Sequence, residues 1–278
     1  MIDESVHREL RKEYNPDHSQ LRTLQLQMLD ILIEFDRICK KYNIRYWLDA
    51  GTLLGAVRHG GFVPWDDDLD VCMFPNDYKK LQKACKEELR HPYKWREINT
   101  KENNFSFWAK IINEDVVVRR QVRNPDRVIE QNIWLDIFIV EEGSAKTKQY
   151  IEKIYGKCLR RTNKQLFDGK VNYCIACLLL PFVKLFISIL RGWNKVFHKN
   201  EFIYIYGTPF CPKHYKEYTF PLSVIEFEGK LFRCPGNPHG YLTTFYGDYL
   251  TIPPKEKRVT HEFIFDKSTD ERDVQKVL

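Results

Sequence analysis

The chain has 278 residues, of which 43% are hydrophobic and 29% are charged, and its formal net charge is +6. This length and composition predict a sizeable core, in one unit or in two small domains, and exclude an intrinsically disordered chain. The basic residues are scattered and no recognised binding module accompanies them, so nucleic acid is not expected as a partner.

The first part of the chain alternates predicted helices and strands. Apolar residues at steps of three and four over 21–42 predict a helix with one buried face. Residues 44–50 have the aromatic and branched character of a strand, and Gly51 and Thr52 then begin a short helix. We expect Thr52 to cap this helix, whose free amides are suited to hold a phosphate. A second strand is predicted over 68–74, where acidic and apolar residues alternate.

A helix capped by Asn76 or Asp77 is expected next. Further strands are predicted near Trp95, over 105–112, over 116–120 and over 133–140. The polar residues 113–115 are typical of a turn between two of these strands.

The middle of the chain, 145–200, has a helical pattern that includes the apolar stretch 173–190. Pro181 and Lys184 lie inside this stretch and argue against a membrane span. A buried helical hairpin is therefore favoured over an interfacial membrane element. Residues 201–278 are expected to alternate short strands and turns. The absence of repeats or a low-complexity linker favours one compact unit.

Four acidic side chains, Asp66, Asp67, Asp68 and Asp70, lie within five residues. Carboxylates crowded onto a rigid strand repel one another unless a cation such as Mg²⁺ or Mn²⁺ neutralises them. A solvated acidic turn would be the simpler interpretation of this run alone. Asp136, however, is a lone acid in an apolar strand, which is rare unless it is paired or metal-bound. The spacing does not fit an EF-hand calcium loop.

Four segments together resemble the LicD family, which includes bacterial phosphocholine transferases and animal fukutin-type ribitol-phosphate transferases. They are RYWLDAGTLLGAVRHGGFVPWDDDLDV at 45–71, WLDIF at 134–138, FEG at 227–229 and YGDYLTIPPKEKRVTH at 246–261. The resemblance implies an α+β, nucleotidyltransferase-like fold, with a mixed β-sheet flanked by helices. It implies a single catalytic unit over 1–278, with a core at 20–142, a helical insertion at 145–200 and a C-terminal α/β extension at 201–278 that completes the site.

The resemblance also implies roles for particular residues. Asp68, Asp70 and Asp136 are the expected catalytic acids, and together with Asp66 they are the expected ligands of Mg²⁺ or Mn²⁺. Nucleotide-donor contacts are expected from Gly51, Thr52, Arg58, Lys110, Arg258 and His261, because cations near a diphosphate stabilise the leaving nucleotide. Pairing with an acid is the alternative role for Lys110. Ala50 stands where members of the family often have a second glycine.

The function implied is metal-dependent transfer of a phospho-alcohol, such as phosphocholine, from a CDP-activated donor. The acceptor would be a hydroxyl of a cell-surface glycan or of its lipid-linked precursor, and CMP would be released. A nucleotidylyltransferase that moves the nucleoside monophosphate itself is the nearest alternative. A catalytically inactive, glycan-binding relative is the other.

Eight cysteines are present, and segment 1–14 lacks the apolar stretch of a secretory signal. Reduced thiols and a cytoplasmic location are expected, with peripheral contact to the inner face of the membrane as a further expectation. Cys174, Cys177, Cys211 and His214 have the residue types of a zinc site. The first two lie in an apolar helical segment, where cysteine packs as a small hydrophobic residue, so structural zinc is the less favoured interpretation.

Overall fold

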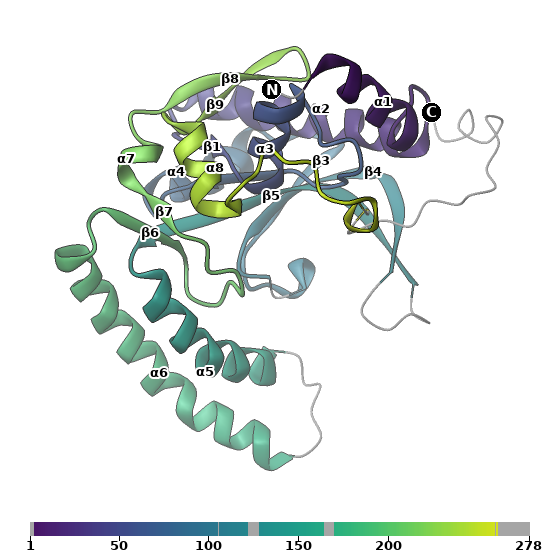
Figure 1. The fold of residues 1–278 in the computed structure, drawn as a ribbon. Coiled ribbons are helices and arrows are strands. Elements are labelled where there is room, and N and C mark those ends of the chain that lie inside the picture. Colours follow the sequence, from purple (N-terminus) through teal and green to yellow (C-terminus); the bar gives the residue numbers. More distant parts are fainter. Residues whose placement is uncertain (1–2, 105, 122–127, 164–169, 259, 261–278) are drawn as a thin grey trace.

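The computed structural model describes residues 3–104, 106–121, 128–163, 170–258 and 260. Its helices are α1 (Glu4–Tyr14), α2 (Gln20–Lys41), α3 (Ala50–His59), α4 (Pro75–Glu88), α5 (Ala145–Asn163), α6 (Lys170–Phe197), α7 (Lys216–Thr219) and α8 (Pro238–Tyr246), with 3-10 turns at Lys101–Asn103 and Lys255–Lys257. Its strands are β1 (Trp47–Leu48), β2 (Asp70–Met73), β3 (Tyr93–Arg96), β4 (Ala109–Gln121), β5 (Val128–Glu142), β6 (Glu201–Tyr204), β7 (His214–Tyr215), β8 (Ser223–Phe227) and β9 (Lys230–Cys234). Figure 1 shows their arrangement.

The main sheet is mixed. Its order is β1-β2-β5-β4-β3, and β6 extends it by pairing with the far end of β5 and with β7. β2 runs parallel to β5, and the other pairs are antiparallel. β8 and β9 form a separate hairpin. Helices pack against this mixed sheet, so the α+β fold expected from the sequence is confirmed.

α2 is the helix predicted over 21–42. Ser19 caps it by accepting a hydrogen bond from the backbone N–H of Arg22 at 3.2 Å. The helix packs on β4 and β5 and contacts α4. The residues of its expected apolar stripe are all buried, and they are Leu24, Met28, Ile31, Phe35 and Ile38. This prediction is confirmed.

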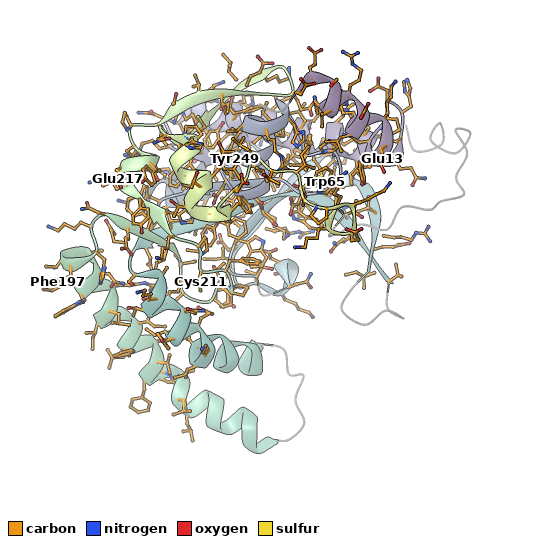
Figure 2. The ribbon with its side chains drawn as sticks, in the orientation of Figure 1. Glu13, Trp65, Phe197, Cys211, Glu217 and Tyr249 are labelled. Carbon is orange, nitrogen blue, oxygen red and sulfur yellow. The ribbon has the colours of Figure 1, made fainter. Side chains whose placement is uncertain are left out.

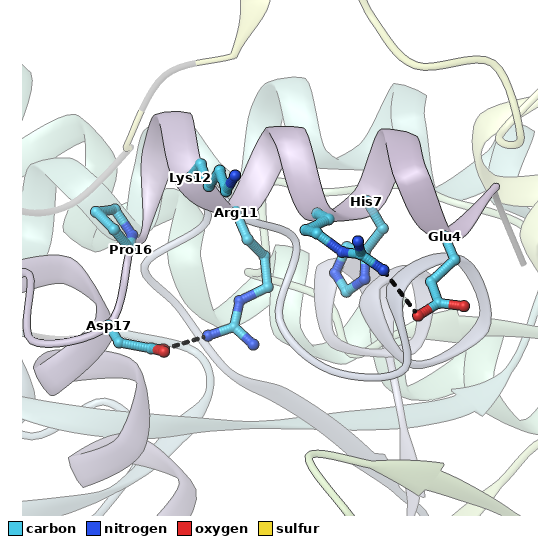
Figure 3. A pocket seen from close by; sticks show the side chains of 7 residues that line it. Glu4, His7, Arg11, Lys12, Pro16 and Asp17 are labelled. Atoms are coloured by element: carbon cyan, nitrogen blue, oxygen red, sulfur yellow. Dashed lines mark hydrogen bonds and ion pairs between the residues drawn. The ribbon is translucent and has the colours of Figure 1, made fainter.

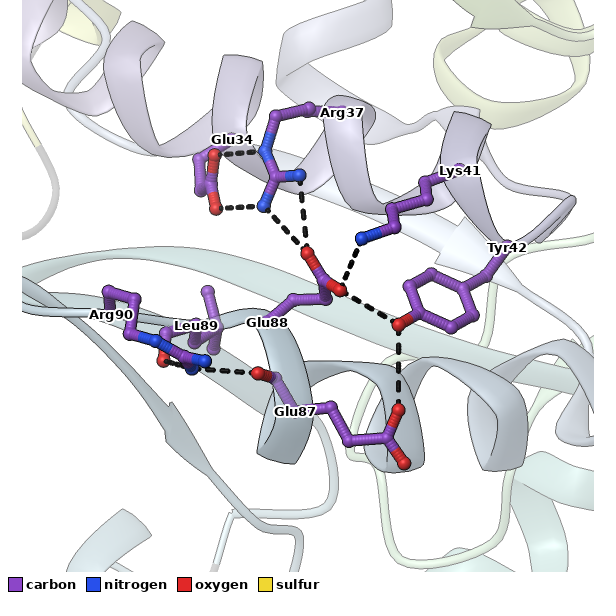
Figure 4. A network of polar contacts seen from close by, with 8 residues as sticks. All are labelled: Glu34, Arg37, Lys41, Tyr42, Glu87, Glu88, Leu89 and Arg90. Atoms are coloured by element: carbon purple, nitrogen blue, oxygen red, sulfur yellow. Dashed lines mark hydrogen bonds and ion pairs between the residues drawn. The ribbon is translucent and has the colours of Figure 1, made fainter.

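A polar network joins the C-terminal half of α2 to the end of α4 (Figure 4). Glu88 accepts hydrogen bonds from Lys41 Nζ at 2.6 Å and from Tyr42 Oη at 2.8 Å, and Arg37 lies 3.4 Å away. These donors lower the pKa of Glu88 to about 2. The network fixes α4 against α2 and so supports the sheet below both helices.

Three local expectations are wrong. Residues 105–112 and 116–120 do not form two strands with a turn, because β4 runs continuously through Ala109–Gln121 with a bulge between Asn113 and Val117. Phe74, not Asn76 or Asp77, occupies the N-cap of α4, and Pro75 opens the helix. α8 was not expected, although Asn237 caps it and Pro238 is its first residue.

The α5–α6 hairpin confirms the helical pattern of 145–200, but the expectation of a buried hairpin is wrong. In Figure 1 the hairpin extends away from the sheet and its covering helices. Its contact with the body includes Tyr155, Ile187, Ile203 and Tyr206, whereas one side of α6 exposes large apolar side chains. No helix in the described part of the chain combines the length and the apolar character needed to cross a bilayer.

Candidate active site

The start of α3 is fixed by Asp49 rather than by Thr52. Asp49 is the N-cap residue, and its carboxylate accepts a hydrogen bond from Ala50 N at 2.9 Å. The expected capping role of Thr52 is therefore wrong. Its hydroxyl instead accepts a hydrogen bond from the backbone N–H of Asp70 at 2.7 Å. Thr52 thereby ties the first turn of α3 to the first residue of β2.

Asp70 and Asp136 lie side by side. They are aligned residues of the parallel strands β2 and β5, so their side chains project from the same face of the sheet. A backbone hydrogen bond from Asp136 N to Leu69 O, at 2.8 Å, fixes this alignment, and Asp49 N donates to Asp70 O at 3.1 Å from the other neighbouring segment. Two acids separated by 66 positions are thus held together by backbone pairing.

The carboxylates of Asp66 and Asp68 lie close to Gly51 in the first turn of α3. A Cβ atom at Gly51 would lie 2.7 Å from Asp66 Oδ2 and 3.7 Å from Asp68 Oδ1. Any larger residue at position 51 would therefore displace the Asp66 carboxylate. This close approach explains why a glycine follows the strand here.

The proximity of these acids perturbs their ionisation. Burial, followed by repulsion from Asp66 and Asp70, raises the pKa of Asp68 well above its usual range. Burial and the charges of Asp136 and Asp49 do the same to the pKa of Asp70. A group of carboxylates in this condition attracts a cation.

Lys110 supplies one positive charge to this group. It is aligned with Asp136 across β4 and β5, and its Nζ lies 2.7 Å from Asp136 Oδ1. The same Nζ sits 3.8 Å from the centre of the Trp134 ring. The alternative considered for Lys110, pairing with an acid, is thus what the structure contains.

The donor set has the chemistry of a Mg²⁺ or Mn²⁺ site, because all of its members are carboxylate oxygens held near one another. In the part of the chain that the structure describes, no three Asp, Glu, His or Cys side chains form a ready-made metal cluster. Mg²⁺ in nucleotide-dependent enzymes commonly uses one or two carboxylates together with substrate phosphates and water. Asp68 and Asp70 fit that pattern, and Asp136, engaged by Lys110, stands beside them.

Tyr246 is a site residue to which sequence analysis assigned no role. It ends α8, and its side chain is 43% exposed. Burial of its hydroxyl and the nearby charges of Asp70 and Asp66 raise the pKa of Tyr246 well above its usual range. The phenol therefore stays protonated and can donate a hydrogen bond. Its position as the first residue of the 246–261 motif is the sequence feature that could have identified it.

Asp49 was also missed. It is completely buried and accepts hydrogen bonds from Tyr204 Oη at 2.8 Å and Tyr241 Oη at 2.7 Å, with His214 Nε2 at 3.8 Å. Burial alone would raise the pKa of Asp49, but His214 and the two phenols lower it below its ordinary value. This ionised side chain joins α3 to β6, β7 and α8. Its partners are too distant in sequence for a local pattern to reveal them.

Ala50 stands where members of the family often have a second glycine, and its backbone conformation is one that glycine adopts more easily. Its φ is +42°, in the left-handed region that favours glycine. An alanine here holds the turn between β1 and α3 in a strained conformation.

Arg58 is buried among protein groups. Its Nε donates to His59 Nε2 at 2.9 Å, and one terminal nitrogen donates to Tyr249 O at 2.9 Å. Burial and the charge of Arg58 lower the pKa of His59 to about 3, so the imidazole remains neutral. Arg58 thus attaches the 246–261 motif to the end of α3. Its expected contact with the donor stays a prediction.

Arg58 and Arg258 also lie near the same indole ring. Their guanidinium carbons are 5.8 Å and 5.6 Å from the centre of Trp65, the residue directly before Asp66. Arg258 Nε donates to Pro253 O at 2.8 Å. Figure 2 labels Trp65 and Tyr249, which mark the two segments that these arginines connect. His261 lies outside the described residues.

The FEG motif at 227–229 has a structural role. Glu228 accepts two hydrogen bonds from Arg22, at 2.9 Å and 2.6 Å, and one from Phe62 N at 3.0 Å. Its backbone N–H donates to Gly60 O at 2.9 Å. Glu228 and Gly229 both have positive φ, so they form the tight turn of the β8–β9 hairpin. The motif anchors the loop that leads to the acids.

Two of the four suggested zinc ligands, Cys211 and His214, lie within the described part of the chain. The His214 ring packs between Tyr204 and Tyr241. Cys211 is a free cysteine, and its Sγ lies 3.7 Å from Nζ of the buried Lys148. The side chains of Cys174 and Cys177 lie outside the described residues. Zinc stays a less favoured prediction.

A hollow of about 490 Å³ lies beside α1 (Figure 3). Its charges are largely paired with one another, because Arg8 lies 3.3 Å from Glu4 and Arg11 lies 2.8 Å from Asp17. These pairs leave little positive charge to attract a phosphate. The acids at the β2–β5 junction remain the better candidate site.

Comparison with known proteins agrees with this geometry. Residues 43–161, which contain the acids and Lys110, match the model of the LicD/FKTN/FKRP nucleotidyltransferase domain. The chain thus contains a domain of the LicD type at residues 43–161. As a LicD-type protein it is an enzyme of the phosphotransferase class.

Similarity to one relative extends beyond that domain, and similarity to others is limited to short segments. It is 27% identical over 274 residues to the lipopolysaccharide cholinephosphotransferase LicD of Haemophilus influenzae, covering 87% of this chain and 95% of that protein. It is 53% identical over 35 residues to the human ribitol 5-phosphate transferase FKRP, which is 13% of this chain and 7% of that protein. An uncharacterized protein of Rickettsia prowazekii is 44% identical over 57 residues, which is 20% of this chain and 21% of that protein.

Proposed function

We propose that this enzyme transfers a phospho-alcohol group, such as phosphocholine, from a CDP-activated donor to a hydroxyl of a glycan. The acceptor is a cell-surface glycan or its lipid-linked precursor, and the second product is CMP. The observation that carries the proposal is the alignment of Asp70 with Asp136 beside Asp68 and Lys110. The similarity to a cholinephosphotransferase over 87% of the chain supports the choice of transferred group.

In this proposal the acceptor oxygen attacks the phosphorus that bears the alcohol, and the bridging P–O bond breaks. The bridging oxygen leaves on CMP, so one phosphodiester forms as the diphosphate is cleaved. The reaction releases the acceptor's hydroxyl proton, and Asp136 accepts it in this scheme. Lys110, whose Nζ lies 2.7 Å from Asp136 Oδ1, positions the carboxylate for that transfer.

Asp68 and Asp70 would hold a divalent ion, which supplies neutralisation of the negative charge that develops on the phosphates. The amides in the first turn of α3, at Gly51 and Thr52, lie at the positive end of a helix dipole and favour an anionic donor. Tyr246 can donate a hydrogen bond to a phosphate oxygen, because its raised pKa keeps the phenol protonated.

The experiment is incubation of the full chain with a panel of CDP-alcohols, Mg²⁺ and a glycan acceptor, followed by nucleotide analysis. CMP release with transfer of the alcohol phosphate supports the proposal. Pyrophosphate release from a nucleoside triphosphate, with the nucleotide attached to the acceptor, would instead identify a nucleotidylyltransferase. Donor binding without turnover of any donor would identify an inactive relative.

A further inference from the structure

α6 exposes a continuous apolar stripe that the transfer chemistry does not use. Phe182, Leu185, Phe186, Ile189, Trp193 and Phe197 follow one another at helical steps, and each is between 53% and 72% exposed. At 1.5 Å per residue the stripe is about 22 Å long. Apolar surface of this extent on a helix marks an interaction site.

The sides of α6 have separate roles. Leu180, Val183 and Ile187 pack toward α5 and the body. The polar side carries Lys184, Arg191 and Lys195, all exposed. A helix with Trp and Phe on one side and basic residues on another has the pattern of an interfacial membrane helix. Figure 2 shows the labelled Phe197 pointing away from the body of the protein.

The charge of the α5–α6 hairpin distinguishes between two possible partners for the stripe, a second copy of this chain and a lipid surface. α5 and α6 together contain ten Lys and Arg residues and one acidic residue, Glu152. Their net charge is thus +9 in a chain whose net charge is +6. A second copy seated on the stripe would bring two such hairpins together and be repelled. A surface of anionic lipid would attract the hairpin.

We propose that the α5–α6 hairpin docks this protein onto the surface of a membrane that contains anionic lipid. The stripe of α6 enters the boundary between headgroups and acyl chains, and the exposed Lys184 and Lys195 add electrostatic attraction to the anionic headgroups. Because α6 does not meet the requirements of a spanning helix, the hairpin lies on the bilayer and does not cross it. This inference does not depend on the chemistry at the acids.

The test is co-sedimentation of the full chain with vesicles of phosphatidylcholine, alone or mixed equally with phosphatidylglycerol. The wild type is expected to bind the mixed vesicles preferentially. Replacing Phe186, Ile189 and Trp193 together by Ser should lower that binding by at least about tenfold, because three exposed apolar side chains are removed. Since all three are exposed in the folded protein, the thermal unfolding midpoint should hardly change.

A matched control removes apolar side chains elsewhere. Val224 and Leu231 are each 62% exposed on the β8–β9 hairpin, and replacing both by Ser should leave vesicle binding unchanged. Replacing Lys184 and Lys195 by Gln keeps the stripe and should weaken the preference for phosphatidylglycerol. Equal vesicle binding by the wild type and the triple variant would overturn the proposal. So would self-association that the triple variant abolishes, without vesicle binding by the wild type.

Discussion

Asp70 and Asp136 are aligned on neighbouring parallel strands, and their side chains project from one face of the sheet. Their mutual repulsion contributes to the raised pKa of Asp70. Only one cation, Lys110, forms an ion pair with either of them among the described contacts. The site therefore carries a deficit of positive charge, which a divalent ion can fill.

The substitution Asp70→Asn tests whether this deficit of positive charge lowers the thermal stability of the metal-free protein. Without a divalent ion, the neutral amide removes a repulsive charge, so we expect a higher thermal unfolding midpoint than that of the wild type in EDTA. Adding Mg²⁺ should raise the midpoint of the wild type and have little effect on the variant. Asp115→Asn, at an exposed carboxylate, is the control and should behave as the wild type does in both conditions. An equal response of Asp70→Asn to Mg²⁺ would contradict the assignment of Asp70 as a ligand.

Thr52→Val tests the link between α3 and β2. The substitution leaves the buried N–H of Asp70 without its acceptor, which should cost about 1–3 kcal/mol of unfolding free energy. Turnover should fall as well, because Asp70 loses a group that positions it. Thr52→Ser keeps the hydroxyl and should retain most of both properties. Urea unfolding and donor turnover measure the two effects, and identical results for Val and Ser would refute the role of the hydroxyl.

Ala50→Gly should stabilise the protein. Ala50 has a φ of +42°, and relieving a left-handed conformation at a residue with a Cβ is worth about 1 kcal/mol. Urea unfolding should therefore show a higher midpoint for the variant. Ala56→Gly, in the same helix and at negative φ, is the matched control and should lower the midpoint. A lower midpoint for Ala50→Gly would show that position 50 is not strained.

Glu228→Ala should destabilise the fold by about 3–5 kcal/mol, because it leaves the largely buried Arg22 without its partner. Arg22 and Phe62 N hold the pKa of Glu228 below its ordinary value despite its burial. Its contribution to stability is therefore present above the ordinary Glu pKa of about 4.3 and is lost as the pH falls through the lowered value. Unfolding midpoints measured between neutral and acidic pH should converge for the wild type and the variant. Glu4→Ala breaks an exposed pair and should change little.

The acids could be predicted from the sequence because their signals are local. A period-two pattern indicates which face of a strand carries Asp70, and a lone acid in an apolar strand indicates a partner for Asp136. The family motifs assigned roles to these residues, and those roles stay predictions. The α+β fold with its mixed sheet was implied by the resemblance to the LicD family.

The parts that the sequence did not predict depend on distant contacts. Residues 113–115 are typical of a turn, yet β5 is long enough to pair with β4 on both sides of this segment, so a bulge forms between Asn113 and Val117. Asp49 acquires its role from Tyr204 and Tyr241, more than 150 positions away. The apolar pattern of α6 was correctly assigned to a helix, but periodicity alone could not say that one apolar side would remain uncovered.

The most direct test of the metal-dependent transfer is CMP release from CDP-choline with a glycan acceptor, measured for the wild type and Asp70→Asn with and without Mg²⁺. We expect release by the wild type only when Mg²⁺ is present, and a loss of at least about 100-fold in the variant, which remains folded. Release at the wild-type rate by Asp70→Asn would contradict the central role of the aligned carboxylates.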